Sequence, residues 1–157
     1  SSLLRNIYFN GNVSVIFSEV SLGNLDAAGN KLPATTRPLQ GQSPYLVNAG
    51  FQYDGEKGTN ISLLYNRIGQ RLSLVGNADF GDIYEKPRDL LDFQISRKVL
   101  KKKAEVRLTI SDLLNQRLAT YENRDSKKSF SQSSDKYFSS YRPGTTITIG
   151  FNYNFSL

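Results

Sequence analysis

The last twelve residues alternate strictly between apolar and polar side chains, and this pattern constrains the fold more than any other stretch. Isoleucine, phenylalanine, tyrosine and leucine fill every second position from Ile147 to Leu157, and threonine, glycine, asparagine and serine fill the positions between them. Side chains of a β-strand point alternately to opposite faces of the sheet. Residues 146–157 therefore predict a strand with one apolar face and one polar face.

Two environments suit such a strand. In a soluble sandwich or barrel the apolar face packs on a core and the polar face meets water. In a transmembrane barrel the apolar face meets lipid, and a tilted strand of about eleven residues spans about 26 Å, which is close to the apolar band of an outer-membrane barrel. This strand alone leaves both interpretations open.

The same alternation recurs five times before the last strand. It predicts six strands in total, over residues 9–20, 44–53, 59–75, 89–99, 104–121 and 146–157. The third interrupts its alternation around Gly69, where a β-bulge is expected. The fifth does so over residues 112–115, where a short helix over residues 111–118 is the alternative.

The connections between these strands alternate in length. Residues 21–43, 76–88 and 122–144 predict long loops, whereas residues 54–58 and 100–103 predict tight turns. In antiparallel up-and-down order, all three long loops lie at one end of the sheet. Short turns at one end and long loops at the other are typical of outer-membrane barrels.

The polar face carries Asn, Gln, Ser, Thr, Arg and Glu along most strands, which is too polar for the dry interior of a small closed barrel. An open sheet in lipid would also leave unpaired backbone groups at its two edges. The chain contains no methionine. We therefore predict an all-β fold, an antiparallel meander of about six strands over residues 1–157 that forms the C-terminal part of a larger transmembrane β-barrel.

The composition excludes several kinds of site. Without cysteine or histidine, the chain lacks thiolate ligands, the commonest general base and the commonest metal ligand. Asp79, Asp82 and Asp89 form a loop cluster of acids, which we interpret as solvated, so no catalytic residue, metal site or cofactor is predicted. The net charge of +6 comes mostly from connections such as residues 101–103, and no strand interleaves cations with aromatics, so no nucleic-acid partner is expected.

Three motifs carry a family resemblance. Thr148, Gly150, Tyr153 and Phe155 resemble an outer-membrane insertion signal, although two residues follow the final aromatic. Residues 110–117 resemble the penultimate strand of TonB-dependent receptors, with Asp112 and Leu114 in place of the usual asparagine and phenylalanine. Residues 37–45 resemble the segment that leads into a late strand of Bacteroidetes receptors. Together these motifs make the chain similar to the last six strands of such a receptor.

The resemblance implies a place in the outer membrane of a Gram-negative bacterium and a role in uptake of scarce nutrients, such as an iron chelate, a vitamin or a glycan. It implies contact with outer-membrane lipid and recognition of the last strand by the barrel-assembly machinery. TonB would act only through a plug that is absent from this chain. The alternative is a soluble β-barrel or sandwich that binds a ligand.

Within the receptor interpretation, aromatic residues of the long loops are the candidates for ligand contact. We single out Tyr84, Tyr137 and Phe138, and we expect Tyr121 and Tyr141 to belong to the aromatic girdle because they flank strands. The girdle at the opposite end of the strands is expected to contain Tyr53, Tyr153 and Phe155.

Overall fold

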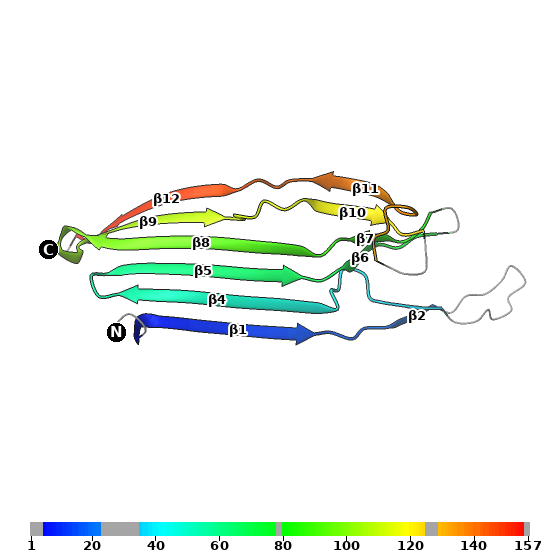
Figure 1. Ribbon diagram of the computed structural model, residues 1–157, viewed down its shortest axis with the longest axis horizontal. Coiled ribbons are helices and arrows are strands. Elements are labelled where there is room, and N and C mark those ends of the chain that lie inside the picture. The colour runs from blue at the N-terminus through cyan, green and yellow to red at the C-terminus, as the bar shows by residue number, and fades with distance from the viewer. Residues whose placement is uncertain (1–4, 23–34, 78–79, 125–128, 156–157) are drawn as a thin grey trace, which may run out of the picture.

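The computed structural model describes residues 5–22, 35–77, 80–124 and 129–155, and antiparallel strands dominate it (Figure 1). Six of them form one sheet, which we call the wall sheet. In order across it they are β1 (Ile7–Val15), β4 (Tyr45–Gly55), β5 (Thr59–Ile68), β8 (Arg88–Val99), β9 (Ala104–Ser111) and β12 (Thr146–Tyr153). Each strand lies beside its neighbour in the chain order of the six, which confirms the predicted all-β, antiparallel meander. Among the described residues, no helix is long and apolar enough to cross a bilayer.

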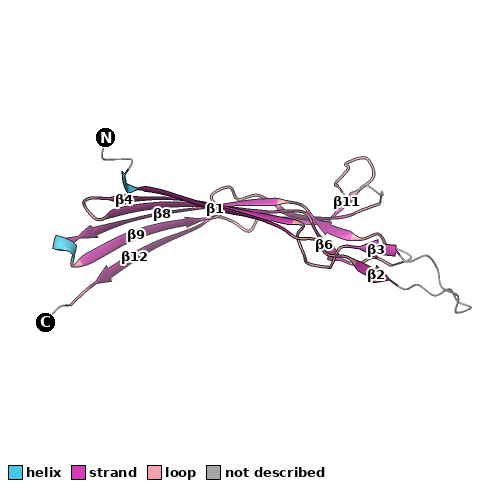
Figure 2. Cartoon of the chain, turned by 90° about the horizontal axis from the view of Figure 1, so that it is seen from below, coloured by secondary structure: helices cyan, strands magenta, loops and turns pink. Residues whose placement is uncertain are grey.

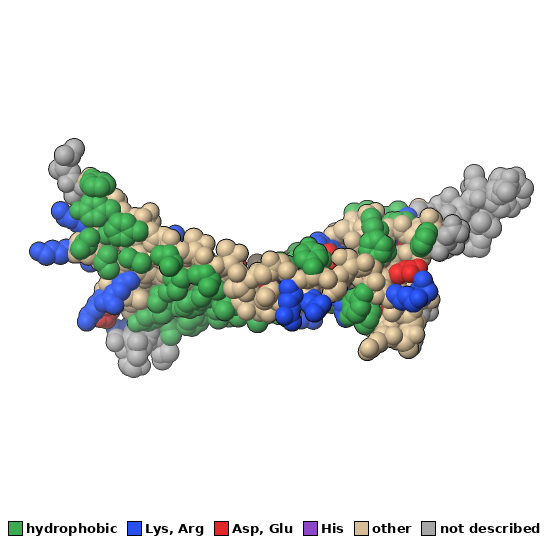
Figure 3. All heavy atoms as spheres, turned by 90° about the horizontal axis from the view of Figure 1, so that it is seen from above, with side chains coloured by type: hydrophobic (Ala, Val, Ile, Leu, Met, Phe, Trp, Pro, Cys, Tyr) green, Lys and Arg blue, Asp and Glu red, His purple; other side chains and the backbone are tan. Residues whose placement is uncertain are grey.

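The strand register aligns apolar residues in rows that cross the whole wall sheet. One row consists of Phe9, Phe51, Leu63, Phe93, Ile110 and Ile147, and the next of Ile7, Tyr53, Ile61, Ile95, Leu108 and Ile149. None of these side chains is buried: Phe9, Phe51, Ile147 and Ile149 are exposed, up to 77% for Ile149 on the edge strand β12, and the others are partly exposed. Figure 3 shows hydrophobic side chains gathered over this half of the molecule. We call this side of the sheet the apolar face.

The opposite side, the polar face, carries hydrogen-bonding residues in the same rows. One row consists of Tyr8, Gln52, Ser62, Gln94, Thr109 and Thr148. A second row links three asparagines, because the Asn66 amide donates to the Asn48 oxygen and the Asn48 amide donates to the Asn12 oxygen. The amphipathic alternation in the sequence is therefore present in the sheet as two chemically distinct faces.

Two tight connections join strands at one end of the wall sheet. Between β4 and β5, the Gly58 amide donates to the Gly55 carbonyl, and Gly58 adopts a φ of 72°, which glycine reaches without a Cβ clash. Between β8 and β9, a single 3-10 turn (Leu100–Lys102) closes with the Lys103 amide on the Leu100 carbonyl. We call this the short-turn end; both predicted turns lie here.

At the opposite end, every wall strand is followed or preceded by a shorter strand. The segments β2 (Val20–Leu22) and β3 (Thr35–Arg37) pair with each other. A second sheet, the distal sheet, has the order β11 (Lys136–Tyr141), β10 (Leu118–Glu122), β7 (Ile83–Glu85) and β6 (Arg71–Leu74). That order repeats the order of the wall strands β12, β9, β8 and β5 that these segments continue (Figure 1). Viewed at 90° to Figure 1, the wall strands fan out with a pronounced twist before the distal strands begin (Figure 2).

This arrangement differs from the predicted boundaries. The strands predicted over residues 59–75 and 104–121 are each split into a wall segment and a distal segment, and the first strand ends at Val15 rather than at residue 20. The predicted loops 21–43, 76–88 and 122–144 contain β3, β7 and β11, while residues 23–34 of the first loop lie outside the described residues. These strands were missed because three to six residues are too few for alternation to be recognised.

The interruption at Gly69 contains no extra residue. The register that pairs Ile68 with Arg88 also pairs Arg71 with Glu85, so both strands pass two residues through the gap. Pro87 has no backbone N–H, and the Tyr45 ring lies where a Gly69 Cβ would point, with its Cε1 only 2.7 Å from that position. The pairing is therefore interrupted at Gly69 without an extra residue, and Arg71 and Leu72 keep the alternation of the wall sheet. The register shifts a few residues further along, between Leu72 and Leu74, where β6 has one residue more than β7.

The second interruption, between β9 and β10, is a turn rather than a helix. Asp112 and Asn115 adopt φ angles of 54° and 43°, a region in which Asp and Asn are enriched among non-glycine residues. The Asn115 amide donates to the Asp112 carbonyl at 3.0 Å, and the Asp112 carboxylate pairs with the Arg88 guanidinium. The Asn115 side-chain oxygen also accepts from the Gly144 amide at 3.2 Å, which ties the turn to the start of β12.

Candidate functional site

The distal sheet has a small aromatic core of its own. Leu72 and Tyr121 are fully buried, Tyr84 is 4% exposed, and Phe130 packs against them from the β10–β11 connection. The rings of Tyr84 and Tyr121 stack at 6.2 Å, and Phe130 meets Tyr121 edge-on at 5.2 Å. Burial raises the pKa of the Tyr84 phenol, and the nearby Asp82 carboxylate adds to the shift. The neutral phenol is thus the form that this core stabilises.

The register assigns this core to one side of the sheet. Arg67 pairs with Asp89 on the apolar face, and Arg71 and Glu85 each lie four residues further along their strands. An even number of residues keeps a side chain on the same face, so the Arg67–Asp89 and Arg71–Glu85 ion pairs both lie on the apolar face. Leu72 and its neighbours across the sheet are offset by one residue and lie on the other side. The aromatic core therefore continues the polar face of the wall sheet, and the connection that carries Phe130 folds over that face.

The carboxylates of Asp135 and Glu122 accept hydrogen bonds from the connections around this core. Asp135, 6% exposed, accepts from the Ser131 amide at 2.8 Å and from the Arg124 amide at 3.0 Å, which closes the described part of the β10–β11 connection. Glu122 accepts from the Arg124 guanidinium at 2.8 Å and from the Gly81 amide at 3.1 Å. These hydrogen bonds, led by the one from Arg124, lower the pKa of Glu122 below the usual range of a glutamate.

A pocket of about 520 Å³ lies beside the aromatic core, and we call it the distal pocket. Lys86, Pro87, Arg117, Ala119, Tyr137 and Ser140 line it. The Lys86 amide donates to the Ala119 carbonyl at 2.9 Å, and Ala119 is the direct cross-strand partner of Ser140. Small side chains thus form the floor of the pocket, and longer ones surround it.

The two cations of the distal pocket have no acidic partner within the part of the chain that the structure describes. Lys86 Nζ lies 3.9 Å from the centre of the Phe130 ring and donates to the Tyr137 hydroxyl at 3.1 Å. Neither Lys86 nor Arg117 forms an ion pair with a described carboxylate. A cation–π contact keeps the ammonium in place without neutralising it. The pocket therefore presents two uncompensated positive charges next to a tyrosine and a serine.

The residues predicted to contact a ligand lie in different surroundings. Tyr137 lines the distal pocket and is 54% exposed, whereas Phe138 is 64% exposed and does not join the aromatic core. Tyr84 is 4% exposed in that core and also lines the larger cavity along β6 that is described below. Tyr121, expected in the girdle, is fully buried in the same core, and Tyr141 is 54% exposed on β11.

Sequence reasoning missed Lys86 and Arg117. Each is an isolated cation in a stretch interpreted as a loop or as the end of a strand, and only the pairing of β7 with β10 brings them to one pocket. The available signal was indirect: both residues lie within one or two positions of a strand interruption, where the backbone leaves the regular sheet.

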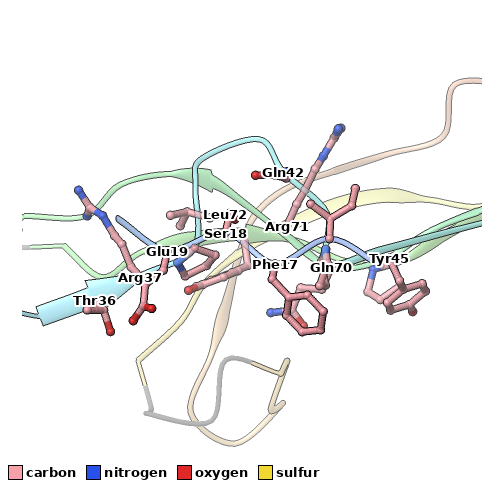
Figure 4. Close-up of a pocket in the computed structure, with 15 residues that line it drawn as sticks. Phe17, Ser18, Glu19, Thr36, Arg37, Gln42, Tyr45, Gln70, Arg71 and Leu72 are labelled. Atoms are coloured by element: carbon pink, nitrogen blue, oxygen red, sulfur yellow. The ribbon is translucent and has the colours of Figure 1, made fainter. Parts of the chain in front are cut away.

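A larger cavity of about 750 Å³ lies along β6, between the β2–β3 hairpin and the distal sheet (Figure 4). Phe17, 93% exposed, and Arg71 extend to opposite sides of the ribbon there (Figure 4). Next to this cavity, residues 39–42 make a turn with Gly41 at a φ of 80°, and the Gly41 amide donates to the Leu72 carbonyl at 2.7 Å. Residues 37–45, the segment that resembles receptor sequences, therefore attach the β2–β3 hairpin to the distal sheet.

Tyrosines border the apolar face at both ends. Toward the distal sheet, the Tyr65 hydroxyl donates to Asp89 at 2.6 Å and Arg67 donates to the same carboxylate at 2.8 Å. Toward the short-turn end, Tyr53 and Tyr153 lie on the same face, and the ring of Tyr153 meets that of Phe155 at 4.6 Å. Aromatic residues at both borders of an apolar band are typical of barrels in a bilayer.

The proposed insertion-signal residues lie on or just after β12. Thr148 pairs with Thr109 and Gly150 with Arg107 on the polar face, while Tyr153 pairs with Ala104 on the apolar face. Phe155, 88% exposed, follows the last backbone hydrogen bond, in which the Asn154 amide donates to the Lys103 carbonyl. Among the described residues β12 pairs only with β9, so its other edge is free for a further strand.

Asp82 and Asp89, two acids of the predicted loop cluster, do not converge on one site in the described structure. Asp89 is paired with Arg67, and Asp82 accepts from the Gly76 amide at 2.8 Å; Asp79 lies outside the described residues. No group of three or more carboxylates able to hold a metal ion occurs within residues 5–22, 35–77, 80–124 and 129–155.

Comparison with known proteins agrees with this architecture. A family model described as "Outer membrane protein beta-barrel family" matches residues 2–153. Neither a curated protein nor a solved structure matches the chain significantly. The apolar face bordered by tyrosines, the meander of six strands and the match over nearly the whole sequence give one conclusion: the chain belongs to the outer membrane protein β-barrel family and resides in the outer membrane of a Gram-negative bacterium.

Proposed function

We propose that this chain supplies part of the wall and of the extracellular mouth of a TonB-dependent receptor of the Bacteroidetes type. Such a receptor takes up a scarce nutrient, such as an iron chelate, a vitamin or a glycan. The chain binds and admits a ligand rather than catalysing a reaction. Its apolar face contacts lipid, and its last strand is recognised by the barrel-assembly machinery.

The observation that carries the proposal is the distal sheet. In outer-membrane barrels the short turns are periplasmic and the long connections are extracellular. The four strands of the distal sheet therefore continue four wall strands beyond the membrane. The aromatic core and the distal pocket lie on the face that lines the barrel interior. A rigid extension with a pocket on its inner face suits capture of a solute better than a simple barrel rim does.

The free edges of β1 and β12 support a larger barrel. In the described structure each of these strands pairs on one side only. An unpaired backbone group in lipid costs several kcal/mol, so further strands must pair with both edges in the membrane. A barrel large enough to hold a plug meets this requirement and also keeps the asparagine row of the polar face hydrated or paired.

The native polypeptide provides the test. We would isolate it from outer membranes in detergent, measure its intact mass and pass it over the immobilised periplasmic domain of TonB. A receptor is expected to have a mass several times 17.6 kDa and to be retained. A native mass of 17.6 kDa, or a larger polypeptide that the TonB domain does not retain, would refute the receptor proposal while leaving the barrel assignment intact.

A further inference from the structure

The distal pocket combines two cations with a lining of hydroxyl and apolar side chains. Lys86 and Arg117 bring two positive charges into one concave site, and every hydrogen-bonding group that accompanies them on a side chain is a hydroxyl, from Tyr137 and Ser140. Two like charges in one pocket repel each other and favour an anion between them. The chemistry of the lining therefore selects for negative charge.

Neighbouring carboxylates do not neutralise this pocket, because each has another partner. Glu85 is paired with Arg71, Glu122 with Arg124, and Asp112 with Arg88. Asp135 is occupied by backbone amides of its own connection. None of these four described acids therefore forms an ion pair with Lys86 or Arg117.

The shape of the pocket adds a requirement for a flat, apolar part. Tyr137 and Pro87 contribute ring surfaces to the lining, and Ala119 and Ser140, which pair across β10 and β11, contribute small side chains. The Tyr137 ring is already stacked against Phe130 at 4.8 Å, so it is held in place before a ligand arrives. A volume of about 520 Å³ accommodates a ring with its substituents.

We propose that the distal pocket binds an organic anion, whose charged group meets Lys86 and Arg117 while its ring lies against Tyr137. This inference rests on the proposed function, since it names the class of solute that the mouth of the receptor would hold. The guanidinium of Arg117 offers paired donors that match a carboxylate, and Lys86 retains donors beyond the one used by Tyr137.

The test uses two small probes and the native protein in detergent. 4-Fluorobenzoate carries the ring and the charge, and 4-fluorobenzamide is its neutral counterpart; binding of each is followed by ¹⁹F NMR. We expect 4-fluorobenzoate to bind at least about tenfold more tightly, as charge-assisted hydrogen bonds require. Equal affinity for the two probes, or binding of neither, would overturn the proposal.

Three variants locate the site. Arg117→Gln and Lys86→Gln should each weaken 4-fluorobenzoate binding by about tenfold and leave 4-fluorobenzamide unchanged. Lys136→Gln is the matched control, because Lys136 carries the same charge on β11 and lies opposite Glu122, on the other face of the distal sheet. An equal loss in Lys136→Gln would mean that overall charge, not this pocket, attracts the probe. Lys86→Gln removes the contact with the Phe130 ring and can perturb folding. Arg117 is exposed, so Arg117→Gln is expected to fold in either case.

A fourth comparison separates a solute from a lipid headgroup. The affinity of 4-fluorobenzoate should be the same in detergent and in nanodiscs of an anionic phospholipid, because the register places the pocket on the interior side. Loss of binding in the nanodiscs would mean that headgroups occupy the pocket and would refute a solute site. Retention by the TonB domain does not depend on this pocket, so failure of the anion inference and failure of the receptor proposal are distinguishable.

Discussion

Leu63 provides the strictest test of which face of the wall sheet meets lipid. It lies in the apolar row that crosses all six wall strands, from Phe9 on β1 to Ile147 on β12. Along β5 it is equidistant from Thr59 and Arg67, about 13 Å of strand from each at about 3.3 Å per residue. Leu63 is therefore expected near the bilayer midplane.

Replacing Leu63 by arginine should destabilise the barrel by about 2–4 kcal/mol, the cost of an arginine facing lipid at that depth. This cost corresponds to a change of roughly 30-fold or more in the folding equilibrium constant. Ser62 is the matched control, because it precedes Leu63 on the same strand and faces the polar side. Ser62→Arg should cost little, since an arginine there reaches the hydrated interior.

Depth provides a second control. Val13 shares its row with Arg67 and Asp89, so that row already accommodates charge at the border of the band. Val13→Arg should therefore cost only about 0–1 kcal/mol. The assay is urea unfolding of the native polypeptide in lipid vesicles, with the folded fraction read from its faster migration in unheated gels. If Ser62→Arg costs as much as Leu63→Arg, or if Leu63→Arg costs less than about 1 kcal/mol, the assignment of the faces is wrong.

Three further substitutions test the turns and the distal sheet. Asp112→Ala removes the partner of the largely buried Arg88 and should cost about 3 kcal/mol in the same unfolding assay, whereas Asp112→Asn keeps the turn geometry and should cost less. Gly58→Ala places a Cβ at a φ of 72° and should cost about 1–2 kcal/mol, a prediction that an unchanged urea midpoint would contradict. Because the folded pKa of Glu122 is lowered, mainly by Arg124, its contribution to stability is present at neutral pH and is lost as the pH falls below about 4. The protection factor of the Gly81 amide, which is the exchange rate corrected for the intrinsic effect of pH, should then fall in the wild type but stay unchanged in Glu122→Gln.

The wall sheet could be predicted from the sequence because its six strands are long enough for alternation to be unambiguous. Residues 45–55 and 88–99 each carry five or more repeats of the period, and the short turns between strands fix the register. The faces also follow from this pattern, since a slip of one residue would place the whole apolar set on the wrong side.

The distal sheet could be predicted only in part: β6 and most of β10 lie inside the predicted strands 59–75 and 104–121, whereas β7 and β11 have three and six residues in stretches interpreted as loops. The pairing of β7 with β10 joins segments that are distant in sequence, so no local pattern indicates it. The interruption at Gly69 resembles a bulge in sequence, yet it lies opposite Pro87, which separates β7 from β8, and beside the Tyr45 ring. Asp112 and Asn115 break the alternation because their backbones are left-handed, a property that composition only suggests. These features depend on neighbours across the sheet.

In the candidate site, too, some residues could be predicted from the local sequence and others only from the pairing of strands. Tyr137 was identifiable as an aromatic residue in a long connection, but the cations beside it come from other strands, and nothing near Lys86 or Arg117 in the sequence marks them as a pair. Tyr84 shows the converse, because an aromatic residue in a predicted loop became a core residue once β7 paired with β10.

The wall and the distal pocket are linked through one register, and this link makes the two proposals depend on each other. Ile68 pairs with Arg88 below the interruption and Arg71 pairs with Glu85 above it, so the side that Leu63 faces decides the side that Lys86 faces. If Leu63→Arg is costly and Ser62→Arg is not, the pocket opens toward the barrel interior and a solute can reach it. The reverse result would turn the same two cations toward the lipid headgroups, where they would bind phosphate at the membrane surface instead.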